Sequence, residues 1–345
     1  MTEAPFLAAC QRLPVSPTPV WFMRQAGRYM PEYRRVRSRH GFLELCRSPD
    51  LAAEVTVTAV ERLGVDAAIL FADILLLLEP LGVGLEYSRN DGPVIHRPVR
   101  GPEDVERLPR IDAAAELPYV YEAVRLARKS LRVPLIGFSG APFTLASYIV
   151  EGGGSRHYLH TKTLMYQAPQ AWHQLMALLV DNVISYLRRQ IEAGAQAVQV
   201  FDSWVGCLSP HDYRQFVLPH MKRLFQGLPA HVPTIHFGTG TAGFLELLRD
   251  GGGTVIGLDW RVDLAEGWQR VGFDRAIQGN LDPAALLASR DLLFEQARTI
   301  LDRAGGRPGH IFNLGHGILP QTSVDQVRAL VDFVHDYSQA AGKNG

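Results

Sequence analysis

Short apolar runs alternate along the chain with longer segments of helical periodicity. The runs are apolar at consecutive positions, as in strands that are buried on both faces of a parallel sheet. Eight of them are expected to be strands, at Val20–Met23, Ala67–Phe71, Leu135–Phe138, Ala197–Phe201, Thr234–Phe237, Val255–Leu258, Ala276–Gln278 and Ile311–Asn313. Eight strands alternating with helices favour an α/β fold whose sheet closes into a (β/α)8 TIM barrel.

The helical segments between these runs have well-marked ends. Proline directly after serine or aspartate, and serine three residues before glutamine, are typical of helix starts. Such starts occur at Ser48-Pro49, Asp282-Pro283 and Ser323 with Gln326. The first of these helices is expected to run to Gly64, and a long helix from Ala168 to Ala193 is expected to end at Gly194.

The spacing of the second and third runs indicates an insertion. About 60 residues separate Asp73 from Val133, more than one connecting helix needs, and a hairpin is expected around Val94–Arg97. One barrel of this kind accounts for a chain of 345 residues. We therefore expect a single domain over residues 1–345, with an N-terminal extension and a longer insertion after the second strand.

Composition narrows the class of protein. Hydrophobic residues make up 47% and charged residues 20%, enough for a large core and too apolar for disorder. A net charge of zero argues against non-specific binding to nucleic acid or anionic membranes. The most apolar stretch, Ala67–Leu85, contains Asp73 and Glu79, so no membrane span is expected. Three well-separated cysteines and the lack of a signal-peptide pattern predict a cytoplasmic protein with reduced thiols.

Polar residues and glycines follow directly on each predicted strand. In a barrel all these positions lie on the C-terminal rim, where active sites are built. Most of them are equally well explained as caps and turns, since glycine, asparagine, aspartate and serine suit both. Arg24, Arg28, Asp73 and His316 are harder to explain in that way and are candidate site residues.

Positive charge is concentrated in one segment. Six arginines and one acid lie between Arg24 and Arg39, and only four of the chain's 35 cations are lysine. Guanidinium groups suit planar carboxylate or phosphate partners, although a solvated helix face or a nucleic-acid-binding arm would also carry such a cluster. Arg24 and Arg28 flank Gly27 directly after a strand, which favours an anion site facing the rim.

Five sequence blocks resemble those of the uroporphyrinogen decarboxylase family. WFMRQAGRYMPEYRRVR at 21–37 is similar to its N-terminal signature, and GFSGAPFTLASY at 137–148, followed by IVEGGG, to its second. GLDW at 257–260, QGNLDP at 278–283 and NLGHG at 313–317 resemble further blocks. The resemblance runs in order from about Leu7 to about His335, nearly the whole chain.

The resemblance implies a cofactor-free (β/α)8 enzyme, usually a homodimer, of tetrapyrrole biosynthesis. Such an enzyme removes the carboxyl groups of the four acetate side chains of uroporphyrinogen III, giving coproporphyrinogen III and CO2. The positions that match the family's substrate contacts are Arg24, Gln25, Ala26, Gly27, Arg28, Arg37, Asp73, Tyr148, Ser203 and His316. Among these, Asp73, Arg24 and Arg28 are the expected catalytic residues.

The implied chemistry agrees with the residues. A substrate with eight carboxylates requires a binding site lined by arginines. If a pyrrole carbon is protonated, the ring becomes a cation that can accept the electrons left when CO2 departs. An ionised Asp73 can accept hydrogen bonds from the pyrrole N–H groups and stabilise the cation that forms. None of the lysines (Lys129, Lys162, Lys222 and Lys343) follows a predicted strand, so no Schiff-base residue is expected.

Three of the matched positions have simpler explanations as well. The Tyr148 side chain could have only a packing role in its helix, and Ser203 could cap the segment that follows it. His316 lies between two glycines, where a hydrogen bond to a substrate carboxylate is the favoured role. The residues do not identify the proton donor to the pyrrole carbon.

The main alternative is a related family of the same fold, the zinc-dependent methyltransferases that act on corrinoid carriers. These use a His-x-Cys metal site near the fifth strand, whereas here His236 is followed two residues later by Gly238. Cys10, Cys46 and Cys207 are not placed to supply the missing thiolate. We therefore expect no metal, and His236 to be a strand histidine with a satisfied hydrogen bond.

Overall fold

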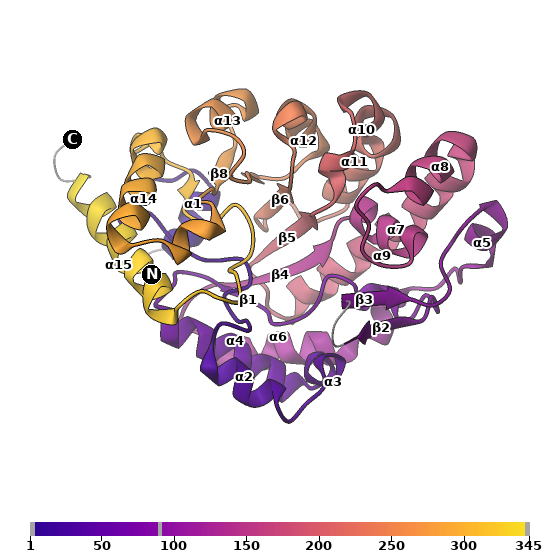
Figure 1. The fold of residues 1–345 in the computed structure, drawn as a ribbon, viewed down its shortest axis with the longest axis horizontal. Coiled ribbons are helices and arrows are strands. Elements are labelled where there is room, and N and C mark those ends of the chain that lie inside the picture. Colours follow the sequence, from indigo (N-terminus) through magenta and orange to yellow (C-terminus); the bar gives the residue numbers. More distant parts are fainter. Residues whose placement is uncertain (1–3, 89–91, 342–345) are drawn as a thin grey trace.

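Seven strands form one parallel sheet in the computed structural model, which describes residues 4–88 and 92–341. Their order is β1-β4-β5-β6-β7-β8-β9, and every neighbouring pair is parallel. The bounds are β1 Ala68–Ile69, β4 Leu135–Gly140, β5 Ala197–Asp202, β6 Thr234–Gly238, β7 Val255–Gly257, β8 Ala276–Gln278 and β9 His310–Ile311. The α/β class and the barrel-like curl of the sheet agree with the sequence-based expectation, as do the positions of these strands (Figure 1).

The eighth position of the barrel is filled by the segment around Val20. Val20 forms a parallel bridge to Phe312, and the Phe312 N–H donates to the Pro19 carbonyl at 2.9 Å. On the other side the Asp66 N–H donates to the Val20 carbonyl at 2.8 Å. The same Asp66 carboxylate accepts the Val20 N–H and the His335 ring, each at 2.7 Å, which ties the closing segment to the C-terminal helix.

The predicted strand Val20–Met23 is therefore wrong in its length. Beyond the bridge at Val20, the Phe22 and Met23 N–H groups donate to the side chains of Gln25 and Asn313 rather than to a neighbouring strand. The apolar pattern remains because Phe22 and Met23 are buried, but the backbone has already begun to turn.

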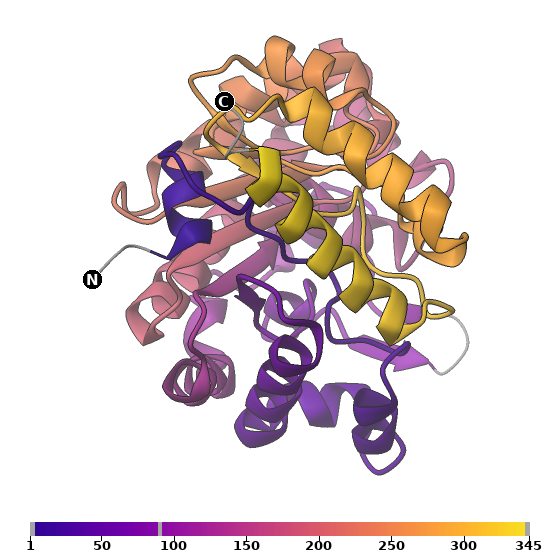
Figure 2. The same ribbon diagram turned by 90° about the vertical axis from the view of Figure 1, so that its left-hand side faces the viewer.

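Helices surround the curled sheet on its outside (Figures 1 and 2). The α-helices are α1 Pro5–Cys10, α2 Pro31–Arg37, α3 Phe42–Arg47, α4 Pro49–Leu63, α5 Pro102–Arg107, α6 Pro118–Ser130, α7 Pro142–Glu151, α8 Leu159–Gln167, α9 Pro169–Ala193, α10 Pro210–Phe216, α11 Leu218–Gln226, α12 Leu245–Gly251, α13 Leu264–Val271, α14 Arg290–Ala304 and α15 Val324–Ala341. Short 3-10 turns occur at η1 Leu76–Leu78, η2 Ala113–Glu116, η3 Val205–Cys207, η4 Ala242–Phe244 and η5 Pro283–Leu287.

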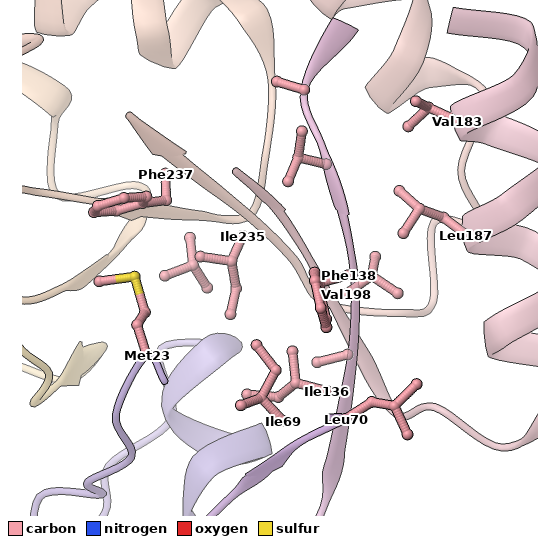
Figure 3. Close-up of a cluster of buried hydrophobic side chains, with 14 of the residues drawn as sticks. Met23, Ile69, Leu70, Ile136, Phe138, Val183, Leu187, Val198, Ile235 and Phe237 are labelled. Atoms are coloured by element: carbon pink, nitrogen blue, oxygen red, sulfur yellow. The ribbon is translucent and has the colours of Figure 1, made fainter. Parts of the chain in front are cut away.

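The apolar core lies on both faces of the strands. Figure 3 shows Val183 and Leu187 of α9 on one side of the sheet, and Ile235 and Phe237 of β6 on the other. Burial on both faces explains why the strands are apolar at consecutive positions instead of alternating.

Some helices begin and end where the sequence predicted, and others do not. α4 ends before Gly64, whose φ of 72° lies in the left-handed region, and α9 ends before Gly194, as expected. Asp282 caps only the 3-10 turn η5, and α14 begins later. At the expected capping box the Gln326 side chain bonds to groups outside its own helix: its Oε1 accepts the Arg290 Nε–H at 3.2 Å, and its amide N–H donates to the Ala288 carbonyl at 3.0 Å, which links α15 to the start of α14.

The insertion after β1 contains the expected hairpin, formed by β2 (Leu85–Ser88) and β3 (Gly92–Ile95) in antiparallel register. The N-terminal extension forms α1, which packs against β9. No disulfide bond links Cys10, Cys46 and Cys207. In the described part of the chain, none of the helices has the length and apolar character needed to cross a membrane.

Candidate active site

A cavity of about 1170 Å³ lies at the carboxyl ends of the barrel strands. Its walls come from the segment after Val20, the segment after β1, the ends of β4, β5 and β6, the hairpin and the segment after β9. All ten residues that matched the family's contacts line this cavity: Arg24, Gln25, Ala26, Gly27, Arg28, Arg37, Asp73, Tyr148, Ser203 and His316. Folding thus brings together positions from 24 to 316 of the sequence.

The turn that carries the first arginines is held by Gln25. This side chain is fully buried, accepts the Phe22 N–H at 3.3 Å and donates to the Ala67 carbonyl at 3.3 Å. The Tyr29 hydroxyl donates to the Gln25 carbonyl at 2.5 Å. Gln25 therefore fastens the turn to the residue preceding β1, and its role in the structure is to place the turn at the cavity.

Arg24 occupies an unusual backbone conformation at the centre of this turn. Its φ of 59° lies in the left-handed region, which costs a residue with a side chain roughly 1–2 kcal/mol. Its aliphatic stem lies against Gly317, where an added Cβ would be only 2.4 Å from Arg24 Cδ. Backbone strain and close packing together direct the guanidinium into the cavity, as is common where a site needs one geometry.

Asp73 lies four residues beyond β1, with its carboxylate in the cavity. Its Oδ1 accepts the Leu75 N–H at 2.8 Å and also the hydroxyl of Tyr87 from the hairpin. Burial raises the pKa of Asp73 above its ordinary value, while the two hydrogen bonds and the charge of Arg24 act in the opposite direction. Asp73 is the one acid among the described residues that line the cavity.

The mouth of the cavity is cationic. Arg28, Arg37 and Arg39 line it together with the Arg24 guanidinium, and none of the four forms an ion pair within the described residues. Arg37 donates to the His40 carbonyl, and its guanidinium carbon lies 5.9 Å from the centre of the Phe42 ring. Four unpaired guanidinium groups around one carboxylate make this a site for an anion with several charges.

The other three matched residues, Tyr148, Ser203 and His316, also line the cavity. The Tyr148 ring stacks on Trp204, with centroids 3.8 Å apart, and Ser203 precedes that tryptophan. Burial, together with the nearby charges of Arg24 and Arg261, lowers the pKa of His316 to about 4. His316 is therefore neutral at pH 7 in the free protein and is a hydrogen-bonding group rather than a cation.

A wall of phenylalanines forms the apolar part of the cavity. Phe138, Phe201 and Phe237 line it, with centroids 5.6 Å apart for the first pair and 5.9 Å for the second. The sequence contained a signal for these residues, because each is the last residue of a predicted strand and so lies next to the rim. No comparable signal pointed to Tyr87, which reaches Asp73 from the hairpin.

Metal ligation and Schiff-base chemistry find no support in the described residues. No group of three or more His, Cys, Asp or Glu side chains in that part of the chain could hold a metal ion. His236 is fully buried in β6 and its Nδ1 lies 3.2 Å from the Gly252 carbonyl, as expected of a strand histidine with a satisfied hydrogen bond, while its Nε2 has no hydrogen-bond partner within the described residues. Lys162 donates to the Cys207 carbonyl away from the cavity, and Lys343 lies outside the described residues.

Sequence comparison identifies relatives over nearly the whole chain. The family model described as Uroporphyrinogen decarboxylase (URO-D) matches residues 1–337. The chain is 56% identical over 336 residues to the uroporphyrinogen decarboxylase of Carboxydothermus hydrogenoformans, covering 96% of both chains. It is 57% identical over 339 residues to the uroporphyrinogen decarboxylase of Sorangium cellulosum, covering 97% of both.

Solved structures of more distant proteins share the fold. A methyltransferase from Methanosarcina mazei superimposes with a TM-score of 0.83 at 22% identity, over 96% of this chain and 98% of that one. A putative vitamin-B12 independent methionine synthase from Listeria monocytogenes gives a TM-score of 0.57 at 14% identity, over 94% and 98% of the two chains. At these identities the likeness concerns the fold alone.

Proposed function

Because this chain belongs to the uroporphyrinogen decarboxylase family, we propose that its arginine-rich cavity binds the carboxylated tetrapyrrole that this family decarboxylates. The activity is that of uroporphyrinogen decarboxylase, a carboxy-lyase of tetrapyrrole biosynthesis. The reaction converts the four acetate side chains of uroporphyrinogen III into methyl groups, with release of CO2, and yields coproporphyrinogen III.

The two sides of the cavity suit the two parts of such a substrate. Carboxylates at the periphery of the macrocycle would pair with Arg24, Arg28 and Arg37, since guanidinium can bind each carboxylate through two hydrogen bonds. The pyrrole rings would lie against the phenylalanine wall. A volume of about 1170 Å³ exceeds the roughly 300–1,000 Å³ of ordinary small-molecule sites, as a large macrocycle requires.

Asp73 has the position to bind the centre of the macrocycle. Pyrrole N–H groups directed at its carboxylate would replace water as hydrogen-bond donors and favour the ionised form against the effect of burial. Protonation of the pyrrole carbon beside an acetate makes the ring cationic, and Asp73 would stabilise that cation electrostatically. Cleavage of the bond to CO2 then returns its electron pair to the ring and leaves an exocyclic methylene. Protonation of that methylene carbon and loss of the proton from the ring carbon give the methyl group, so the substrate is its own electron sink and no added cofactor is required.

His316 and Tyr148 have supporting roles in this proposal. A neutral imidazole can donate one hydrogen bond to a substrate carboxylate, and the Tyr148 hydroxyl can donate another. Burial raises the pKa of Tyr148, so its proton stays on the hydroxyl across the physiological range. Neither property assigns the proton donor to the pyrrole carbon.

The observation that carries these assignments is that, among the described residues that line the cavity, four arginines surround one acid, Asp73. The test is conversion of anaerobically reduced uroporphyrin to less carboxylated products. Asp73→Asn should fold normally and lower kcat/KM by roughly 10²–10³-fold, the cost of removing one preorganised electrostatic group. Glu79→Gln is the matched control, because Glu79 is near Asp73 but does not line the cavity. Near-wild-type turnover in Asp73→Asn would refute the role of the carboxylate.

The zinc- and corrinoid-dependent methyltransferase alternative is disfavoured by the residues at the fifth predicted strand. Gly238 has no thiol to contribute, and the His236 ring lies beside Phe225 on the helix side of β6, away from the cavity-lining Phe237. Decarboxylation that persists in the presence of a chelator and without a corrinoid partner would separate the two functions.

The family resemblance also supports a homodimer, a cytoplasmic location and one domain over residues 1–345. The lack of disulfide bonds among the three cysteines is in keeping with a reducing compartment. Sedimentation equilibrium would test the dimer, and a single cooperative unfolding transition would test the single domain.

A further inference from the structure

Behind the cavity wall, Thr144 connects two segments that are distant in sequence. Thr144 is fully buried in the first turn of α7, and its hydroxyl donates to Oδ1 of Asp202 at 2.8 Å. The same hydroxyl oxygen accepts the Trp204 N–H at 3.3 Å. A hydroxyl has one proton to donate and two lone pairs, so Thr144 can form both bonds at once.

These two bonds hold both neighbours of a cavity residue. Asp202 is the last residue of β5, and Trp204 is the N-cap of η3, so Ser203 lies between two residues that Thr144 bonds. The Trp204 ring in turn stacks on Tyr148, with centroids 3.8 Å apart and planes inclined by 30°. Thr144 therefore reaches two cavity-lining residues, Ser203 through the backbone and Tyr148 through the ring stack.

We propose that Thr144 and Asp202 are positioning residues for the decarboxylation: together they hold the 202–204 turn so that Ser203 and the Tyr148 hydroxyl meet the substrate. The proposal rests on the role proposed above for Tyr148 and on Ser203, which matches a substrate contact of the family and lines the cavity. Neither Thr144 nor Asp202 lines the cavity, so both act only through other residues.

The burial of Asp202 makes its hydrogen bond with Thr144 important for the position of the turn. The side chain is fully buried, and its Oδ2 has no partner within the described residues. Burial raises the pKa of Asp202 to about 7, and the hydrogen bonds from Thr144 act in the opposite direction. Loss of the Thr144 hydroxyl removes its hydrogen bond to Asp202 and also the bond that its oxygen accepts from the Trp204 N–H, so we expect the turn to move rather than stay in place.

The test compares Thr144→Val with Thr144→Ser. Valine has nearly the shape of threonine without the hydroxyl, and serine keeps the hydroxyl. We expect Thr144→Val to raise KM for reduced uroporphyrin by about five- to tenfold, the scale of one lost hydrogen bond, and Thr144→Ser to restore most of the wild-type value. The control is Thr161→Val, because Thr161 is also fully buried and its hydroxyl also donates to a carboxylate, that of Glu151 at 2.8 Å, away from the cavity.

A double-mutant cycle with Tyr148→Phe separates positioning from loss of stability. If Thr144 acts through the Tyr148 hydroxyl, Thr144→Val should cost less in the Tyr148→Phe background than in the wild type. Full additivity, an unchanged KM in Thr144→Val, or an equal effect of Thr161→Val would overturn the proposal. If Thr144→Val does not fold, Trp204→Ala offers a second test, because Trp204 is half-buried and its removal takes away the ring that stacks on Tyr148. Trp204→Ala should raise KM by a similar factor. An unchanged KM in Trp204→Ala would also overturn the proposal. If Tyr148→Phe and Ser203→Ala are themselves silent, the substrate contacts proposed above are wrong instead.

Discussion

Gly317 offers a stringent test of the active-site geometry, because this glycine leaves room for the side chain of Arg24. A Cβ at position 317 would lie 2.4 Å from Arg24 Cδ, 2.6 Å from Cγ and 2.9 Å from Nε. Carbon atoms in contact prefer separations of about 3.5–4.0 Å, so the stem must move by about 1 Å. The stem cannot simply swing aside at its tip, because the three closest atoms lie in the middle of the side chain.

The expected consequence of Gly317→Ala is loss of turnover without loss of fold. A displacement of about 1 Å breaks the alignment of a guanidinium with a carboxylate, and a charge-assisted hydrogen bond is worth about 1.5–3 kcal/mol. At about 1.4 kcal/mol per factor of ten, kcat/KM should fall by roughly 10–100-fold. The assay is anaerobic conversion of reduced uroporphyrin at substrate concentrations below KM, with the melting temperature measured alongside.

Two further variants make this prediction refutable. Gly243→Ala adds the same methyl group where the structure has open space, and it should leave kcat/KM unchanged. In an Arg24→Ala background Gly317→Ala should have no additional effect, because the stem it displaces is gone. If Gly317→Ala keeps at least half of the wild-type kcat/KM, or costs as much without Arg24 as with it, the steric explanation is wrong.

Three other predictions concern charge. Because burial raises the pKa of Asp73, its ionised form destabilises the fold at neutral pH, so Asp73→Asn should melt at or above the wild-type temperature at pH 7, with the difference shrinking toward pH 4. Arg39→Ala should lower kcat/KM a few-fold at low ionic strength and less at high salt, whereas Arg35→Ala, on the same segment but outside the cavity lining, should not. The hydrogen bond to Asp66 raises the pKa of His335, so its stabilisation is complete below about pH 6.5 and is lost as pH rises through the raised value; thermal melts of His335→Gln should therefore differ more from the wild type at pH 5.5 than at pH 8.5.

Much of the candidate site could be predicted because parallel strands share one end. Residues that follow the strands must meet on one rim whatever the detailed packing, so Arg24, Asp73, Ser203 and His316 could be grouped before any coordinates. The phenylalanines at the strand ends were open to the same reasoning. Their apolar character fitted the strand pattern, and so hid their position at the cavity.

Contacts between distant segments could not be predicted in this way. Tyr87 meets Asp73 only because the hairpin folds back over the rim, and nothing in its local sequence distinguishes it from a surface tyrosine. Gln326 has the spacing of a capping box, yet its amide finds the Ala288 carbonyl when α15 packs beside α14 (Figure 2). In both cases the competing partner is absent from the local sequence window.

By itself the sequence determined the parallel α/β architecture, the positions of most strands and helix ends, the family, and the anionic character of the ligand. These properties depend on local periodicity, on turn chemistry and on the density of charge in one segment, all of which exist before the chain folds. Only the tertiary structure decided that a short segment around Val20 closes the barrel, that Gly317 supports Arg24 and that Thr144 joins the two segments behind Tyr148. Such contacts form only when segments far apart in the chain approach to within a few tenths of an ångström of a specific distance. The packing of the whole molecule sets that distance.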